Sequence, residues 1–245
     1  MMQLSAMLNA FSGFMSSQNF DPHADMIFAV GYSNPGGIQS LNLGLQYTKP
    51  IVNPPVFQPF VNISQKIFST LRIANMSSLV IEEDTHNPYG FRQPHMEVTF
   101  AHSPDIYSRT HTLFNASTAL VASVQGVNYF LILQPSPALS EQNILGLKAA
   151  DGRDVLALLS ISYNDSTDDS TVANAVKSFF SNLKALAANL GVDRSFIYLN
   201  YAAPFQDPIS GYGAANKARL QSASLKYDSY GLLQTGVSGG FKLFP

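Results

Sequence analysis

The sequence has 245 residues, of which 46% are hydrophobic, 11% aromatic and only 12% charged. This length allows a sizeable core, and the apolar content excludes a disordered chain, which needs few apolar residues and much charge. The net charge of −2 and the lack of a basic run argue against nucleic-acid binding, which depends on clustered Lys and Arg. No apolar stretch reaches the roughly 20 residues that a transmembrane helix needs.

Targeting features lead us to expect a secreted full-length protein. Cysteine is absent, which excludes disulfides and thiolate metal sites. Residues 1–17 lack the basic region and unbroken apolar core of a signal peptide, and their apolar residues recur at helical spacing instead. Low charge combines with four Asn-x-Ser sequons, which would carry glycans in a secreted protein. The sequons begin at Asn62, Asn75, Asn115 and Asn164.

The first half of the sequence predicts strands and one short helix. Turn formers at residues 34–37 separate two apolar runs and predict a β-hairpin. Asn75 or Ser77 is placed to cap a short helix over residues 79–83. Four runs are expected to be strands: residues 25–33, 41–47, 67–73 and 94–100.

The second half mixes longer helices with apolar strands. Helices are predicted over residues 104–125, from Asp168 or Asp169 to Gly191, and over residues 214–226. Strands are predicted at residues 127–133, 154–163 and 195–201. Together these elements predict an α+β fold, with an antiparallel sheet flanked by helices, as a single domain over residues 1–245.

Common catalytic templates are poorly matched. Residues 236–240 read Gly-x-Ser-x-Gly, but only five residues follow, too few for the helix of a nucleophile elbow. The histidines at 86, 95, 102 and 111 lack the three- or four-residue spacing that places two imidazoles on one metal, so we expect no metal site. Neither a dinucleotide-binding glycine pattern nor a P-loop occurs.

The stretch YLNYAAPFQDPISGYG, residues 198–213, places an amide and phenols at the end of an apolar run. Read as a strand, it directs Tyr198 and Asn200 to one face and Leu199 and Tyr201 to the other. Tyrosines pack well in strands, and an asparagine can end one by bonding to its own turn. The pattern alone therefore leaves both a structural and a functional interpretation open.

The C-terminal part of the chain carries an ordered series of features: Tyr-x-Asn-Tyr at 198–201, Gln-x-Pro-Ile at 206–209, Tyr212-Gly213, Asn216, Arg219-Leu220, Tyr227-Asp228, Gly231, Gln234 and the Gly-Gly-Phe-Lys-Leu run at 239–243. With this series the chain resembles the C-terminal half of fungal FAD-linked oxidoreductases of the vanillyl-alcohol oxidase superfamily, the relatives of berberine bridge enzyme. Upstream, residues 47–60 and 71–83 are similar to segments of that family's substrate domain.

The resemblance implies a substrate-binding domain over residues 1–245, whose segment 195–245 returns to an FAD-binding half. Tyr198 and Asn200 would contact the flavin. Tyr201 would be the base that takes a proton from an alcohol, sugar or amine while hydride passes to the flavin. The implied cofactor is FAD, and the implied partners are an FAD-binding half, in cis or in trans, and a small-molecule substrate. Strand placement adds three candidate substrate contacts: Tyr47, Arg92 and His95.

Two departures from the family pattern bear on activity. Ala203 stands where many members carry an Asp two residues after Tyr-x-Asn-Tyr. The sequence also lacks the Arg-x-x-Gly-x-Gly-His segment and a flavin-attachment residue, so we expect the chain alone to hold FAD poorly and to be inactive. It is interpreted as a fragment of an oxidase, as a half-enzyme that assembles with a separate FAD half, or as a non-redox binding domain descended from one.

Overall fold

The computed structural model describes residues 2–16, 20–64, 66–87, 89–136, 143–147 and 153–244. Its centre is one five-stranded antiparallel sheet with the strand order β2-β1-β4-β5-β3. The predicted hairpin is present as β1 and β2, which pair from Ala24 with Tyr47 to Ser33 with Ile38. The strands are β1 (Ala24–Ser33), β2 (Ile38–Tyr47), β3 (His95–Ala101), β4 (Asn128–Pro135) and β5 (Asp154–Ser162).

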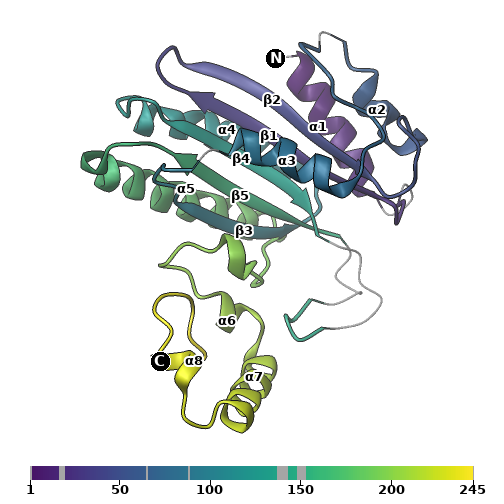
Figure 1. The fold of residues 1–245 in the computed structure, drawn as a ribbon. Coiled ribbons are helices and arrows are strands. Elements are labelled where there is room, and N and C mark those ends of the chain that lie inside the picture. Colours follow the sequence, from purple (N-terminus) through teal and green to yellow (C-terminus); the bar gives the residue numbers. More distant parts are fainter. Residues whose placement is uncertain are drawn as a thin grey trace.

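Three helices cover one face of this sheet (Figure 1): α1 (Met2–Met15), α4 (Pro104–Ser117) and α5 (Asp169–Asn189). Alternate residues of each strand point to this layer, as the twofold period of a strand requires. Met26, Phe28 and Val30 of β1 are buried in the main core with Phe11 of α1 and Phe179 of α5. The predicted α+β fold with an antiparallel sheet and flanking helices is confirmed.

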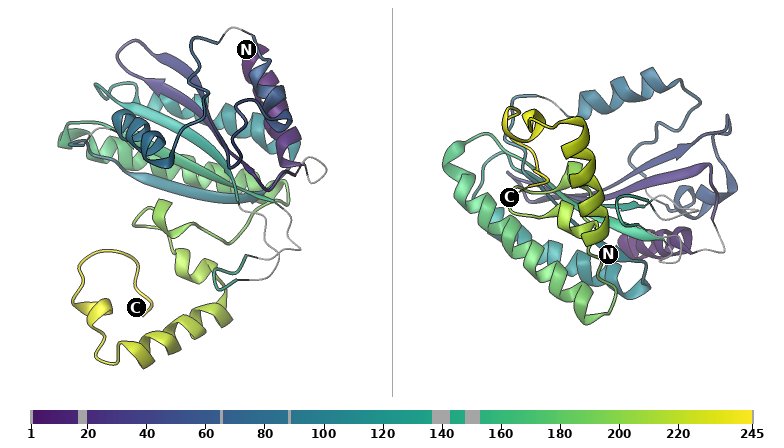
Figure 2. Two further views of the ribbon diagram at one scale, coloured as in Figure 1. Left: turned by 45° about the vertical axis from the view of Figure 1, so that its right-hand side comes forward. Right: turned by 90° about the horizontal axis from the view of Figure 1, so that it is seen from below.

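Helix α3 (Met76–His86) lies on the other side of the sheet, as the right-hand view of Figure 2 shows. The side chain of Asn75 caps it by accepting the N–H of Ser78 at 2.8 Å, which confirms the cap predicted from the sequence. Its apolar side chains Val80 and Ile81 are exposed. Therefore α3 is outside the main core.

The C-terminal segment leaves the sheet and extends beyond β3 (Figure 1). A small apolar cluster attaches it to the sheet, in which Phe196 and Tyr212 pack with Leu147 and Leu156 of the main body. Beyond this cluster, Tyr230 and Leu232 are exposed. Within the described residues, the other helical elements are η2 (Pro55–Phe57), α2 (Gln58–Val61), η3 (Thr118–Val121), η5 (Ser166–Asp168), η6 (Leu199–Tyr201), α6 (Pro208–Gly211), α7 (Ala214–Tyr227) and α8 (Leu232–Thr235).

Two predicted strands are wrong, and one predicted helix is too long. Residues 67–73 form no strand, because this run pairs with no neighbouring strand and its side chains Ile67 and Phe68 are exposed. Residues 195–201 form irregular backbone that ends in η6, where the N–H of Tyr201 bonds to the carbonyl of Tyr198. The helix predicted over 104–125 ends as α4 at Ser117 and continues only as the 3₁₀ turn η3.

Candidate active site on the open face of the sheet

The face of the sheet opposite α1, α4 and α5, called the open face below, has an apolar centre. Ile27, Phe130 and Ile132 are half-buried there. Phe130 lies opposite Gly31 in the register of β1 and β4. A Cβ atom on Gly31 would lie 2.4 Å from the Phe130 ring, so this glycine allows the ring to lie close over β1.

The side chains of the Tyr-x-Asn-Tyr motif gather at one end of this face. The Tyr201 hydroxyl donates a hydrogen bond to Oε1 of Gln134, on β4, at 3.3 Å. The Tyr198 and Tyr201 rings meet edge to face, with centroids 4.9 Å apart. Asn200 is exposed and donates from Nδ2 to the Tyr198 hydroxyl at 2.8 Å. The prediction that the two tyrosines face opposite ways is therefore wrong, because a 3₁₀ turn replaces the expected strand.

The surroundings of Tyr201 hold its phenol in the protonated form. Burial is the largest cause that raises its pKa, followed by the Tyr198 phenol and the negative charge of Asp25. A free tyrosine already has a pKa of about 10. Tyr201 is therefore neutral at physiological pH in this chain, and a role as base needs a further group that lowers its pKa.

A buried carboxylate lies directly beneath the motif. Glu97, on β3, is 0% exposed. Its Oε1 accepts a hydrogen bond from the Thr99 hydroxyl at 2.6 Å, and its Oε2 accepts the N–H of Tyr198 at 3.0 Å. Burial raises the pKa of Glu97 to about 8, although both hydrogen bonds and the nearby charge of Lys184 lower it.

Neither Glu97 nor the role of Gln206 is predicted from the sequence. Gln206 belongs to the Gln-x-Pro-Ile resemblance, and in the structure its side chain is buried and bonds to the main chain of Glu97. A glutamate between apolar neighbours in a strand normally indicates the solvent side. The strand pattern carries no signal of its burial, because the edge position of β3 and the segment that covers it are set by the tertiary fold.

The three candidate substrate contacts do not lie together. Tyr47 is on the helix-covered face, where its hydroxyl donates to Asp21 Oδ2 at 3.0 Å. Arg92 precedes β3 and pairs with Asp169, with 2.5 Å between Nε and Oδ1. That pair borders a polar hollow with Tyr163, and no residue of the motif lines this hollow. The structure thus brings neither Tyr47 nor Arg92 to Tyr201.

His95 does share the open face with Glu97, two residues away on β3. It is half-buried, and its Nδ1 has no hydrogen-bond partner within the described part of the chain. Burial lowers the pKa of His95, which favours the neutral imidazole. A neutral ring of this kind offers both a donor and an acceptor to a polar ligand.

The described residues contain no group of three or more His, Asp or Glu side chains that could hold a metal ion. Among them, too, no helix combines the length and the apolar character needed to cross a bilayer.

Comparisons with known proteins agree with the resemblance seen in the sequence. No protein-family model matches the chain. It is 32% identical over 241 residues to the FAD-dependent monooxygenase drtC of Aspergillus calidoustus, a match that covers 94% of this chain and 45% of that protein. It is 30% identical over 234 residues to the FAD-dependent monooxygenase sdcF of Emericella nidulans, covering 91% and 48% of the two chains.

The fold is also found in a solved structure. The 6-hydroxy-D-nicotine oxidase of Arthrobacter nicotinovorans superposes with a TM-score of 0.64 at 14% identity, over 93% of this chain and 49% of that one. The chain thus spans about half the length of the curated relatives and of the solved structure that it matches. By sequence the chain is a homologue of part of fungal FAD-dependent monooxygenases, and its fold matches about half of 6-hydroxy-D-nicotine oxidase, which is consistent with the C-terminal half of a vanillyl-alcohol-oxidase-like protein; FAD is the cofactor of these relatives.

Proposed function

We propose that this chain is the substrate half of an FAD-dependent oxidoreductase that oxidises an alcohol, a sugar or an amine. Its partner is an FAD-binding part, in cis or in trans. The observation that carries the proposal is the Tyr198, Asn200 and Tyr201 cluster, which lies beside an apolar sheet face that none of the three core helices covers.

The residues present fit a flavin at this place. Ile27, Phe130 and Ile132 offer a half-buried apolar surface suited to a planar ring or an organic substrate. The exposed amide of Asn200 and the hydroxyl of Tyr198 offer polar atoms to the edge of such a ring. When bound, the flavin supplies the acceptor for hydride.

In this proposal, Tyr201 takes the substrate proton at its phenolic oxygen. Gln134 orients the phenol through the hydrogen bond to its Oε1. A neutral amide cannot itself remove the phenolic proton, so the completed site must lower the pKa of Tyr201 by a cation or a hydrogen-bond donor. His95 is proposed as a polar substrate contact, whereas the positions of Tyr47 and Arg92 give that role no support.

Segment 195–245 is proposed to contact the FAD-binding part. Large apolar side chains in it are exposed, Tyr230 at 98% and Tyr227 at 81%, and such surfaces commonly mark an interface.

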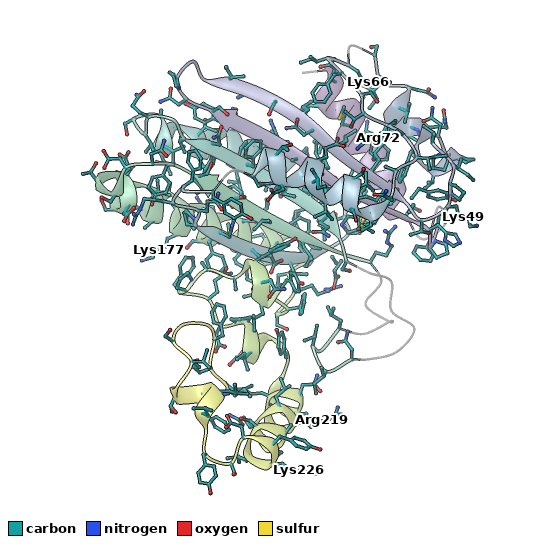
Figure 3. All side chains as sticks on the ribbon, in the orientation of Figure 1. Lys49, Lys66, Arg72, Lys177, Arg219 and Lys226 are labelled. Carbon is teal, nitrogen blue, oxygen red and sulfur yellow. The ribbon has the colours of Figure 1, made fainter. Side chains whose placement is uncertain are left out.

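Secretion of the full-length protein is proposed from its four sequons, whose asparagines are all exposed. Absence of nucleic-acid binding stays a prediction; the cations labelled in Figure 3 are dispersed, with Lys177 on α5 and Arg219 and Lys226 on α7.

A second function is supported by the electrostatics of Tyr201. Every resolved influence on its pKa is upward, and Ala203 replaces the family's Asp nearby. A descendant that binds a small molecule on the open face, without redox chemistry, would tolerate both features. The two functions differ in whether Tyr201 affects electron transfer.

The test is a chimera in which this chain replaces the matching region of the Aspergillus calidoustus relative. We expect the chimera to retain FAD and to reduce it anaerobically with a member of an alcohol, sugar and amine panel. Tyr201→Phe should then slow flavin reduction by about 100-fold or more, the usual contribution of a general base, while FAD retention is unchanged. A folded, FAD-loaded chimera in which Tyr201→Phe reduces flavin at the parent rate would refute the assigned base.

The matched control is Tyr89→Phe, an exposed tyrosine outside segment 195–245 that follows α3, which should leave the reduction rate unchanged. The 245-residue chain alone should bind FAD weakly and show no turnover. Substrate binding to the chimera without flavin reduction would favour the second function.

A further inference from the structure

β3 is an edge strand, so one side of its main chain has no neighbouring strand. At Glu97 the side chain of Gln206 occupies that side. Its Nε2 donates to the carbonyl of Glu97 at 2.7 Å, and its Oε1 accepts the N–H of Glu97 at 3.2 Å. The same Oε1 accepts the N–H of Ala203 at 2.9 Å, so one amide joins the strand to the loop that follows the motif.

The carboxylate of Glu97 makes the second attachment. It accepts the N–H of Tyr198, the first residue of the motif. Tyr198 and Ala203 bracket the 3₁₀ turn that carries Asn200 and Tyr201. One residue of the sheet therefore holds both ends of this turn, through its side chain at one end and through Gln206 at the other.

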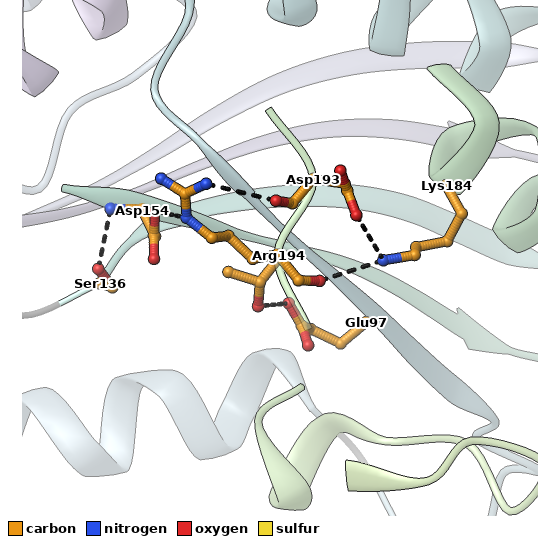
Figure 4. Close-up of polar contacts among 7 residues, drawn as sticks. Glu97, Ser136, Asp154, Lys184, Asp193 and Arg194 are labelled. Atoms are coloured by element: carbon orange, nitrogen blue, oxygen red, sulfur yellow. Dashed lines mark hydrogen bonds and ion pairs between the residues drawn. The ribbon is translucent and has the colours of Figure 1, made fainter. Parts of the chain in front are cut away.

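The neighbouring segment closes the rest of the edge. The N–H of Arg194 donates to the carbonyl of Thr99, and the N–H of Ala101 donates to the carbonyl of Val192. Figure 4 shows Lys184 of α5 paired with Asp193 and bonded to the carbonyl of Arg194, with the Glu97 carboxyl nearby. That carboxyl also accepts the Thr99 hydroxyl. The chain thus reaches the motif along a fixed path.

Burying a carboxylate is expensive, and an apolar side chain would pack in a core at lower cost. Glu97 is 0% exposed and Gln206 is 7% exposed, yet both bond to the motif segment, Glu97 to the N–H of Tyr198 and Gln206 to the N–H of Ala203. The groups that face the Glu97 carboxylate are the Thr99 hydroxyl, the Tyr198 N–H and the charge of Lys184. These contacts order a loop that carries candidate catalytic groups.

We propose that Glu97 is the positioning residue of this site: with Gln206, it fixes the Tyr198–Gln206 segment so that the Tyr201 hydroxyl lies at Gln134 on the open face. Any catalytic consequence rests on the proposed function, but the attachment itself does not. A protonated or an ionised carboxyl keeps an oxygen that accepts the Tyr198 N–H. The attachment therefore requires an acceptor at this position and not a negative charge.

The test is amide hydrogen exchange on the full 245-residue chain with Glu97→Leu and Glu97→Gln. In Glu97→Leu we expect the Tyr198 amide to exchange about 10- to 100-fold faster, as expected when a buried donor loses its acceptor. The amides of Leu159 and Ile161 in β5 should keep their rates. Glu97→Gln should restore Tyr198 protection to within about threefold of the parent, since its amide oxygen still accepts.

Glu83→Leu on exposed α3 is the matched control and should change none of these amides. An unchanged Tyr198 rate in Glu97→Leu would overturn the proposal, as would equal acceleration of Leu159 and Ile161, which would mean that Glu97 stabilises the fold as a whole. If Glu97→Leu does not fold, Gln206→Leu provides the second variant, with faster exchange expected at Ala203. Because no flavin or substrate is needed, this result stands or fails separately from the chimera experiment.

Discussion

The hydroxyl of Tyr201 lies 3.3 Å from Oε1 of Gln134, a contact that joins the Tyr-x-Asn-Tyr motif to a strand 67 residues earlier in the chain. This distance is long for a hydroxyl donor, whose hydrogen bonds are usually about 2.7–2.8 Å. Gln134 can therefore orient the phenol, but the hydrogen bond that it accepts is too weak to promote loss of the phenolic proton. The chemistry proposed for Tyr201 depends on groups that complete the site.

The first prediction concerns the charge of Asp25 and the pKa of Tyr201. Asp25→Asn should lower the pKa of Tyr201, because it removes a negative charge that disfavours the phenolate. NMR titration of ¹³C-labelled tyrosines measures this pKa, with Tyr201→Phe to assign the resonance. Asp84→Asn on α3 is the control and should have no effect. A pKa that is unchanged or higher in Asp25→Asn would contradict the placement of Asp25 beside the phenol.

The second prediction concerns the pH dependence of stability and follows from Glu97. Its folded pKa of about 8 lies above its ordinary 4.5, so the folded state binds the proton more tightly than the unfolded state. Stability from this group is therefore fully present below about pH 4.5 and is lost as pH rises towards 8. At about 1.4 kcal/mol per pH unit, the loss is a few kcal/mol and at most roughly 5.

Urea unfolding followed by circular dichroism at pH 5, 6.5 and 8 checks this prediction. Glu97→Gln should lack the loss and should be more stable than the parent at pH 8. Burial lowers the pKa of His95, His102 and His111, so the histidines contribute stability that increases with pH. They are present in both proteins and cancel in the comparison. If the free energies of unfolding of the two proteins changed in parallel with pH, the pKa of Glu97 would not be raised in the folded state.

Much of the fold could be predicted because its elements carry their own patterns. The hairpin of β1 and β2 was visible from turn formers between apolar runs, and α5 from its apolar stripe. Residues 195–201 carry an equally strand-like pattern, but the edge of β3 is already bonded to residues 192 and 194 and to Gln206. Such competition for one strand edge is a tertiary effect that no local pattern reports.

The site was only partly predictable, for a related reason. Tyr198, Asn200 and Tyr201 were found through a family resemblance, whereas their spacing alone fitted an ordinary strand end. Glu97 escaped notice because strand alternation places a glutamate on the side opposite the core, and the sequence does not tell whether that side is covered. Its burial becomes visible only when the loop containing Gln206 is placed over β3.

The third prediction tests the packing of the open face. Gly31→Ala should destabilise the fold by about 1–3 kcal/mol, because the new methyl group would lie 2.4 Å from the Phe130 ring and 2.6 Å from Ser40 Oγ. Gly44→Ala is the matched control on the adjacent strand, where the nearest atoms are 3.6 Å away. It should be neutral or slightly stabilising, within about 1 kcal/mol. Equal unfolding free energies for the two variants would mean that Phe130 does not lie over Gly31.

The fourth prediction compares two Arg–Asp pairs that differ in burial. Arg194 Nε lies 3.0 Å from Asp154 Oδ1, and the Asp154 side chain is 5% exposed. Arg92 Nε and Asp169 Oδ1 are closer, at 2.5 Å, but both side chains are 44% exposed. Removing one partner of a buried pair leaves the other charge in a poor solvent, whereas water and salt compensate an exposed one.

Arg194→Met should therefore lower the free energy of unfolding by about 2–4 kcal/mol, and Arg92→Met should have little effect. Urea unfolding at low and high salt measures both variants, and high salt should reduce only the small contribution of the exposed pair. Arg194 also bonds to the segment that leads to Tyr198, so its variant should expose amides of residues 193–198 to faster exchange. Similar losses of unfolding free energy in the two variants would mean that Asp154 is as well solvated as Asp169. The segment that leads to Tyr198 would then need a stabilising contact other than the Arg194–Asp154 pair.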